Sequence, residues 1–229
     1  MSTQLIRTIL KDVPIFKELT SEELESVVEI SQSRFYKQKT LVFMQEQPLD
    51  RVFFIKSGKV KIYKTDVNGR EQIVSILEPG EMFPHAGFFR KGTYPAYAEV
   101  MGDANFVVTP IADFEQVLIT YPHLCIKIFN VLGEKIVDLQ NRLQEQILNN
   151  TYEQIIMLLL RLCRTNGVKE NEKYRLTTHF TNREMANMIG TSRETVSRTI
   201  SQLKKNGVLQ LNNEGLYIVD HKKLHEEIA

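Results

Sequence analysis

The hydrophobic period of the chain changes twice, and this change constrains the fold more than any other feature. Apolar residues follow a helical spacing before residue 33 and alternate with a period of about two from about Ser33 to Pro110. After Pro110 the helical spacing returns. Because a helical pattern does not settle as a strand, the sequence predicts an all-β segment between two helical segments.

Short strand-like runs fill the middle segment. The runs are residues 41–43, 52–56, 60–65, 72–77, 97–101 and 105–108. Asn68-Gly69 joins two of them, and Asn-Gly is the strongest short signal for a β-hairpin. Many short strands separated by glycine and proline predict a barrel or a double-sheet roll.

The segment from about His123 to Asn149 predicts one long helix with a narrow apolar stripe. Because polar residues flank the stripe, it predicts a helix that pairs with a second copy of the chain. Packing of the stripe on the chain's own roll is the alternative, and the polar Gln146 weakens the last layer. The residues of the predicted seam are Phe129, Leu132, Ile136, Leu139 and Leu143.

Two helix signals follow each other closely in the last third of the chain. Thr181 with Glu184 after it is a capping box, and Gly190 ends the helix that this box begins. Thr191-Ser192 then begins a second helix, which runs to about Asn206. A helix, a short turn containing glycine and another helix form the helix-turn-helix pattern.

Charged and polar side chains are expected on the exposed face of the second helix, near its start. Arg193 offers a two-pronged donor to guanine, and Glu194 can accept from the cytosine amino group. Residues at this end of a recognition helix reach base edges in the major groove. An exposed helix in which Glu194 pairs with Arg198 is the alternative. The predicted base-reading residues are Arg193, Glu194, Ser197 and Arg198, and the predicted contacts to the DNA backbone are Thr181, Arg183, Thr191, Ser192 and Lys204.

The flanking residues support the same prediction. Tyr152–Arg164 predicts an apolar helix, Lys169–Lys173 a charged loop and residues 208–220 a β-hairpin. A helix-turn-helix followed by a hairpin is a winged helix. Residues 151–229 hold 12 Lys and Arg against 9 Asp and Glu, a net charge of +3, whereas the whole chain carries +1. This mild local excess favours a nucleic-acid surface.

The predicted fold class is therefore α+β, in three segments. Residues 1–120 form a jelly-roll sensor domain with N-terminal helices, residues 121–150 a dimerisation helix and residues 151–229 a winged-helix DNA-binding domain.

Composition and motifs exclude several classes of protein. No run reaches the roughly 18 apolar residues of a membrane span and no signal peptide is recognised, so we expect a cytoplasmic protein without membrane contact. The sequence lacks G-x-S-x-G, H-E-x-x-H and P-loop motifs and a metal-like histidine cluster, which argues against an enzyme and against a metal site. Cys125 and Cys163 are expected to be buried, with a thiol switch as the alternative.

The segment TNREMANMIGTSRETVSRTISQLKKNGVLQL closely resembles the helix-turn-helix of the cyclic-AMP receptor protein and fumarate–nitrate regulator (CRP/FNR) family. The order of the predicted segments is also that of the family. The resemblance implies a transcription regulator that binds double-stranded DNA as a homodimer and contacts RNA polymerase, here through a loop at Thr165–Lys173. The family includes activators and repressors, and both stay open.

The resemblance also gives roles to single residues. Arg193, Glu194 and Arg198 match the base-reading residues of the cyclic-AMP receptor branch, whereas Ser197 matches a serine of the fumarate–nitrate branch. It therefore favours inverted repeats of TGTGA, with TTGA-like sites as the alternative.

The resemblance fails at the cyclic-nucleotide cassette. Pro84-His85 occupies the place of the family's Gly-Glu pair, and Pro95-Ala96 that of its Arg-Ser or Arg-Thr pair. Because a buried phosphate without that arginine is poorly compensated, we expect no tight binding of cyclic AMP. We expect no cofactor, and no iron–sulfur cluster because the cysteine cluster is missing. The residues expected at the effector pocket are Met82, Pro84, His85, Ala86, Pro95 and Ala96.

The signal that would control such a regulator stays open. An uncharged or aromatic effector, haem ligation by His85 or His123, and a constitutive regulator are alternatives. A ligand-sensing module with weak DNA binding is the second class of function. Some family members with a similarly altered cassette control arginine deiminase genes, which serves as an analogy only.

Overall fold

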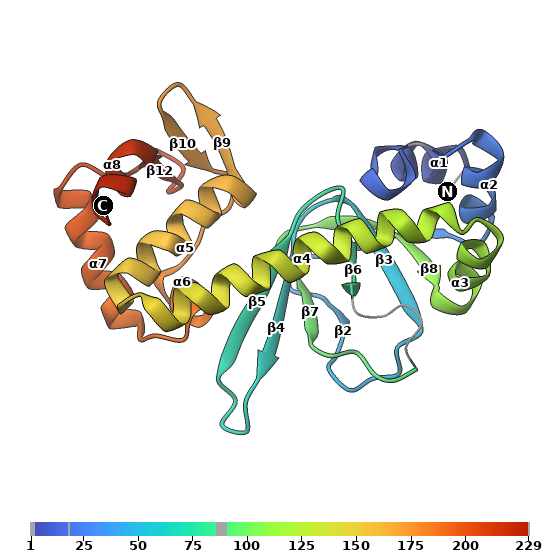
Figure 1. Cartoon of the computed structure of the whole chain (residues 1–229), viewed down its shortest axis with the longest axis horizontal. Helices are drawn as coiled ribbons and strands as arrows, with labels where there is room; N and C mark the ends of the chain where they lie inside the picture. Colours follow the sequence, from blue (N-terminus) through green and yellow to red (C-terminus); the bar gives the residue numbers. More distant parts are fainter. Residues whose placement is uncertain (1–2, 18, 86–90, 229) are drawn as a thin grey trace. The chain divides into compact units, whose positions relative to one another are not determined.

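The computed structural model describes residues 3–17, 19–85 and 91–228, and its contacts divide the chain into two compact units. The first unit comprises Met1–Gly69 and Ile73–Val137, and the second comprises Arg70–Gln72 and Asp138–Ala229. The boundary falls inside the long helix α4, so this helix contributes residues to both units (Figure 1).

Helices lie on both sides of an all-β segment, as the hydrophobic period predicts. In chain order the helices are α1 (Thr3–Asp12), η1 (Pro14–Phe16), α2 (Ser21–Glu29), α3 (Ile111–Thr120), α4 (His123–Leu148), α5 (Thr151–Asn166), α6 (Asn182–Ile189), α7 (Arg193–Lys205) and α8 (His221–Glu226). The strands are β1 (Gln32–Tyr36), β2 (Leu41–Phe43), β3 (Arg51–Ser57), β4 (Val60–Thr65), β5 (Glu71–Leu77), β6 (Met82–Phe83), β7 (Tyr97–Val100), β8 (Ala104–Pro110), β9 (Gly167–Glu170), β10 (Lys173–Leu176), β11 (Leu209–Leu211) and β12 (Tyr217–Asp220).

The strands of the first unit form a double-sheet roll. One sheet has the order β1-β8-β3-β6 and the other the order β2-β7-β4-β5. The chain passes from the first sheet to the second at Gly58, which has a φ of 85°. A Cβ atom there would lie 2.4 Å from the Cβ atom of Ala104, so this crossing requires glycine. The α+β class and the roll are confirmed.

Aromatic rings fill the interior of the roll. Phe43 stacks on Tyr94 with a centroid distance of 3.8 Å, and Phe53 stacks on Phe83 at 5.0 Å. Phe106 meets Phe83 edge-on at 5.5 Å. All of these rings are buried, and the Tyr94 hydroxyl donates to the Asp50 carboxylate at 3.0 Å. Edge-on contacts such as that of Phe106 with Phe83 are among the arrangements that aromatic rings favour, so these side chains supply both packing and local order.

The helices of the first unit cover the outer face of β3 and β8. Phe54 of β3 points to this face and packs between Phe16 and Phe114, at centroid distances of 5.0 and 5.8 Å. The beginning of α4 joins the same core through Leu124 and Ile128. Alternate residues of β3 therefore serve two cores, one on each side of the sheet.

The second unit is built from α5 to α8 and one antiparallel sheet of order β11-β12-β10-β9. The hairpin predicted at residues 208–220 is present as β11 and β12. The charged loop predicted at Lys169–Lys173 is wrong, because these residues belong to the hairpin of β9 and β10, with Asn171 at its tip. Lysine and glutamate are common on an edge strand such as β9, where they discourage pairing with another chain. Among the described residues, no helix is long and apolar enough to cross a membrane.

Candidate DNA-reading helix-turn-helix

Helix α6 begins with the capping box that the sequence predicts. The Thr181 hydroxyl accepts from the Glu184 backbone N–H at 3.1 Å, and the Glu184 carboxylate accepts from the Thr181 N–H at 2.8 Å. The helix buries Met185, Ala186 and Ile189. These two local features, a cap and an apolar face, fix where the first helix of the motif begins and what it packs against.

The turn between the two helices depends on Gly190. This residue has a φ of 74°, in the left-handed region, and its N–H donates to the Ala186 carbonyl at 2.9 Å. The Thr191 N–H donates to the same carbonyl at 3.1 Å. Ser192 then caps α7 by accepting from the Thr195 N–H at 3.1 Å. The chain thus leaves α6 and enters α7 with its free backbone groups largely satisfied.

Helix α7 divides its side chains between a buried and an exposed face. Val196, Ile200 and Leu203 are buried in the core of the unit. Arg193, Glu194 and Arg198 are exposed near the start of the helix, and Ser197 is half-buried beside them. The structure therefore brings all four predicted base-reading residues to one exposed region at the N-terminal half of α7.

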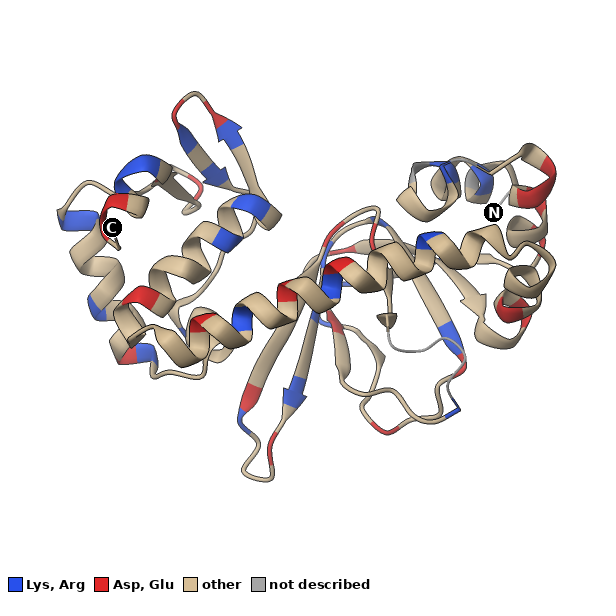
Figure 2. Ribbon diagram, in the orientation of Figure 1, with Lys and Arg blue, Asp and Glu red and all other residues tan. Residues whose placement is uncertain are grey.

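The exposed residues of α7 have no ion partner in the described part of the chain. The structure contains no Glu194–Arg198 pair, although their spacing of four residues would permit one, and Arg193 has no carboxylate within ion-pair distance among the described residues. The salt-bridged surface helix, which was the alternative, is therefore not what the structure shows. Figure 2 shows Lys and Arg on both α7 and α8.

The predicted contacts to the DNA backbone lie at the start of α6, in the turn and, for Lys204, in the last turn of α7. Arg183 is exposed, and Thr191 is half-buried in the turn. The Thr181 hydroxyl also donates to Glu184 at 2.8 Å, and the Ser192 hydroxyl lies 2.9 Å from that of Thr195, so both are already used inside the protein. The Lys204 ammonium lies 5.4 Å from the centroid of the Tyr217 ring. A phosphate role for these residues stays a prediction.

The C-terminal end of α7 is held by hydrogen bonds to Glu227 that the sequence did not predict. The Asn206 side chain donates to the Glu227 carboxylate at 3.0 Å, and the same carboxylate accepts from the Tyr152 hydroxyl. These contacts join α5, α7 and the end of α8. Their sequence separations of 21 and 75 residues leave no local pattern that could have predicted them.

The predicted seam of α4 is exposed within one chain. The exposed fractions are 63% for Phe129, 56% for Ile136, 54% for Leu139 and 61% for Leu143. Leu132 is the exception, because it packs against the core beneath the helices of the first unit. An exposed apolar stripe of this extent is unusual for a surface that stays in water.

Comparison with known proteins agrees with this geometry. A family model described as the cyclic nucleotide-binding domain matches residues 33–121, and one described as the Crp-like helix-turn-helix domain matches residues 153–227. Together they span most of the chain, in the order found in one group of regulators. The chain belongs to the CRP/FNR family of transcription regulators.

Relatives of this CRP/FNR protein match almost its whole length. It is 26% identical over 216 residues to the "CRP-like cAMP-activated global transcriptional regulator" of Mycobacterium tuberculosis, covering 94% of this chain and 96% of that protein. It is 27% identical over 220 residues to the "Cyclic AMP receptor protein" of Thermus thermophilus, covering 96% and 98%. The structure of a CooA mutant from Carboxydothermus hydrogenoformans matches with a TM-score of 0.75 at 22% identity, covering 96% of this chain and 95% of that one. The last likeness concerns the fold alone.

The residues expected at the effector pocket of this CRP/FNR protein lie in different environments. Pro84 and Ala96 are buried, whereas Pro95 is exposed. Met82 packs against the helix-side core and not into the roll interior. Ala86 lies outside the described residues.

His85 lies close to charged groups of α4 and the roll. The pKa of His85 is lowered to about 4, chiefly by burial and in part by the Lys135 charge, while the Glu81 charge opposes the shift. The Lys135 ammonium itself forms an ion pair with the Glu81 carboxylate at 2.8 Å. Because the imidazole is neutral at pH 7, it does not replace the positive charge of the family's missing arginine.

The two cysteines differ in their surroundings. Cys163 is buried on α5, and burial raises the pKa of its thiol to about 12. Such a thiol is inert at neutral pH. Cys125 is half-buried, and its Sγ atom lies 3.8 Å from the Leu118 carbonyl oxygen, within reach of a weak S–H···O hydrogen bond.

Proposed function

We propose that this CRP/FNR regulator acts as a homodimer that reads a TGTGA-like inverted repeat through Arg193, Glu194, Ser197 and Arg198. The observation that carries the proposal is the exposed group of two arginines and one glutamate on α7, which lies opposite the buried face and makes no ion pair within the described chain. The arginine and glutamate side chains have the donor and acceptor geometry for guanine and cytosine edges.

Dimerisation is supported by the α4 stripe. Burying a leucine side chain contributes about 1.5–3 kcal/mol, so exposing four large apolar residues on one helix is costly until a partner covers them. A parallel pair of such helices gives the two-fold symmetry that an inverted repeat requires. The same symmetry places the two α7 helices at half-sites about one helical turn of DNA apart.

We further propose that neither cyclic AMP nor a cofactor is required for DNA binding. The position of the family's arginine is taken by Pro95, which offers no charge to a cyclic phosphate. Phe43, Phe53, Phe83, Tyr94 and Phe106 fill the roll with ring contacts. A constitutive regulator, or one with an uncharged effector, agrees with these features.

RNA polymerase is the second proposed partner. The predicted contact segment, Thr165–Lys173, comprises the end of α5, strand β9 and the tip of the β9–β10 hairpin. Val168, Lys169 and Glu170 are exposed there, so the segment is open to a protein partner.

A gel-shift titration with untagged protein tests the proposed specificity. A duplex with TGTGA and its inverted repeat should bind more tightly than one in which the guanines are replaced, at the same stated salt concentration. The Arg193→Ala variant should lose about 1–3 kcal/mol of this discrimination. Lys222→Ala, which removes a positive charge from α8, is the matched control and should keep the preference.

Two outcomes decide against the proposal. If Arg193→Ala keeps the full preference for TGTGA, Arg193 does not read a base. If the wild-type protein binds all duplexes weakly and equally, the ligand-sensing module with weak DNA binding is the better description.

A further inference from the structure

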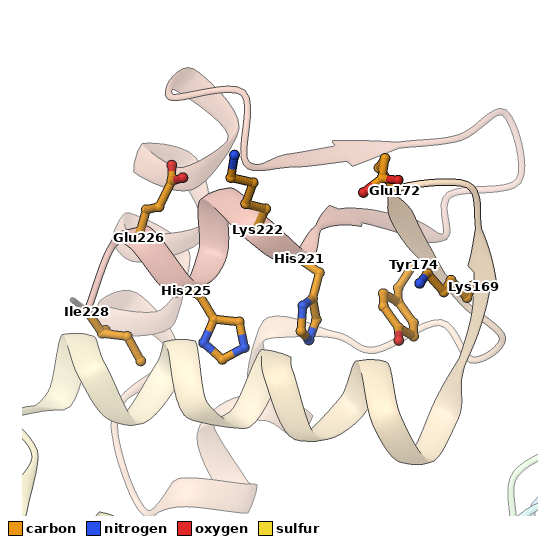
Figure 3. A pocket seen from close by; sticks show the side chains of 8 residues that line it. All are labelled: Lys169, Glu172, Tyr174, His221, Lys222, His225, Glu226 and Ile228. Carbon is orange, nitrogen blue, oxygen red and sulfur yellow. The ribbon is translucent and has the colours of Figure 1, made fainter.

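A pocket of about 700 Å³ lies in the second unit, and none of its lining residues belongs to α7. It is lined by the β9–β10 hairpin, by α8 and by Ile228 beyond that helix, as Figure 3 shows. Two imidazoles, those of His221 and His225, stand side by side in it on the same face of α8. The DNA-reading site described above uses neither histidine.

The two imidazoles are placed as ligands of one ion would be. Their ring centroids are 4.7 Å apart. Two imidazoles that bind one ion through nitrogens at about 2.0–2.1 Å, at an angle of about 90–110°, have centroids roughly 4.5–5.2 Å apart. The spacing of four residues on a helix keeps both rings on one face. The observed centroid separation of 4.7 Å therefore falls within the range that two imidazoles binding one ion would have.

The ring nitrogens are not committed to other groups. Neither His221 nor His225 makes a hydrogen bond to any residue that the structure describes, and the contacts of His221 are ring contacts with Tyr174 at 5.1 Å and with His225. His225 is exposed and His221 half-buried, so an ion from solvent can reach both. Histidines without hydrogen-bond partners on one helix face are available to a ligand.

The charge of the pocket permits a cation but limits its affinity. Lys169 and Lys222 line the pocket together with Glu172 and Glu226, so the lysine and glutamate charges balance. Imidazole binds a metal ion in its neutral form. The Lys169 ammonium lines the same pocket and repels a cation, so binding should be of moderate strength.

We infer that His221 and His225 form an open site for one divalent transition-metal ion, with water in the remaining coordination positions. Imidazole nitrogen suits Zn²⁺, Ni²⁺ and Cu²⁺, and affinity rises toward Cu²⁺ in the order of these metals. Mg²⁺ and Ca²⁺ prefer oxygen ligands and are excluded.

Metal binding at this site would act on the end of α7. Helix α8 has six residues, and an ion bridging His221 and His225 would hold it across one turn. Glu227 follows directly after this helix and accepts from Asn206 at 3.0 Å, at the end of α7. An ion in the pocket therefore stabilises the contact that holds the recognition helix at its far end.

Calorimetric titration of the untagged full chain with NiCl₂ tests the site. We expect one ion to bind per chain, and His225→Gln to weaken binding roughly tenfold or more, because even indirect ligand partners have effects of this size. His221→Asn should do the same. His179→Gln, an exposed histidine of the same unit, is the matched control and should bind Ni²⁺ as the wild type does.

A spectroscopic measurement keeps the test independent of folding. The electron paramagnetic resonance spectrum of the Cu²⁺ complex should show two nitrogen ligands in the wild type and one in His225→Gln, with circular dichroism confirming that each variant is folded. Equal Ni²⁺ binding by wild type and His225→Gln would overturn the inference, as would a wild-type spectrum without imidazole nitrogen.

Discussion

At the scale of residues, the side chains that cap the helices of the second unit and those proposed to read bases are different sets on the same helices. Thr181 and Ser192 have hydroxyls occupied as helix caps. Arg193, Glu194 and Arg198 lie within two turns of the Ser192 cap, and no described residue pairs with them. The caps and buried faces determine where α7 begins and how it is turned, and this leaves the charged side chains free.

His85 provides a prediction for stability against pH. Its pKa is lowered to about 4 in the folded protein, whereas an unfolded histidine titrates near 6.5. Between these values the unfolded chain binds the proton first, so the free energy of unfolding should fall as the pH falls from 6.5 to 4. The full loss is about 3 kcal/mol.

Urea denaturation at neutral pH and near pH 4 measures this loss. The His85→Gln variant should show a smaller loss than the wild type over the same range, and His179→Gln, which changes an exposed histidine, should not differ from the wild type. A His85→Gln variant with the wild-type pH dependence would contradict the assignment.

At the scale of elements, local patterns predict what depends on neighbours in sequence. The capping box at Thr181, the left-handed Gly190 and the Asn68-Gly69 turn all act within a few residues, and the corresponding elements are present. The β9–β10 hairpin escaped prediction because its inner strand, β10, is held by pairing with β12, far along the chain, while β9 pairs with β10 alone. Strand β1 also escaped prediction, because it is held by pairing with the distant strand β8. Strand β6 escaped because two residues are too few to show an alternating pattern.

At the candidate site too, local patterns do not predict contacts that depend on the folded structure. The face of α7 that carries Arg193 follows from the helical period, but whether Glu194 pairs with Arg198 depends on side-chain rotamers, which no spacing determines. The contacts of Glu227 with Tyr152 and Asn206 depend on the folded unit as a whole. Sequence reasoning therefore reached the residues of the interface and not the network that supports them.

The exposed apolar stripe of α4 should hold two copies of the chain together. Leu139→Glu should weaken self-association, because each copy then places a charge where an apolar side chain would be buried, and each lost leucine removes about 1.5–3 kcal/mol. Sedimentation velocity over a range of concentrations measures the dissociation. Gln140→Glu, which introduces the same charge at the neighbouring exposed position, is the control. A Leu139→Glu variant with unchanged self-association would show that the stripe is not the dimer seam.

At the scale of the whole molecule, two units with separate cores share one helix. The beginning of α4 packs with the first unit through Leu124 and Ile128. Its later part belongs to the second unit, where Glu145 forms an ion pair with Arg161 of α5 at 2.7 Å. One continuous helix therefore belongs to both units.

The whole protein should not respond to cyclic AMP. Because the resemblance puts Pro95 at the position of the family's phosphate-binding arginine, calorimetry should show no cyclic AMP binding at micromolar concentrations, and the gel shift should not change when the nucleotide is added. The Thermus thermophilus relative called cyclic AMP receptor protein is a positive control for the nucleotide stock. Binding of micromolar affinity or tighter by this chain would contradict the prediction.

The lack of internal partners for Arg193, Glu194 and Arg198 among the described residues affects the rate of DNA binding. No contact within the described chain has to break before these side chains engage a base, so no internal rearrangement of α7 delays the encounter. The rate at which the protein finds DNA should then be governed by diffusion and by attraction to phosphates, and it should fall steeply as salt is added. The lifetime of the complex, in contrast, should depend on the base sequence, so a regulator of this kind would distinguish its sites by how slowly it leaves them.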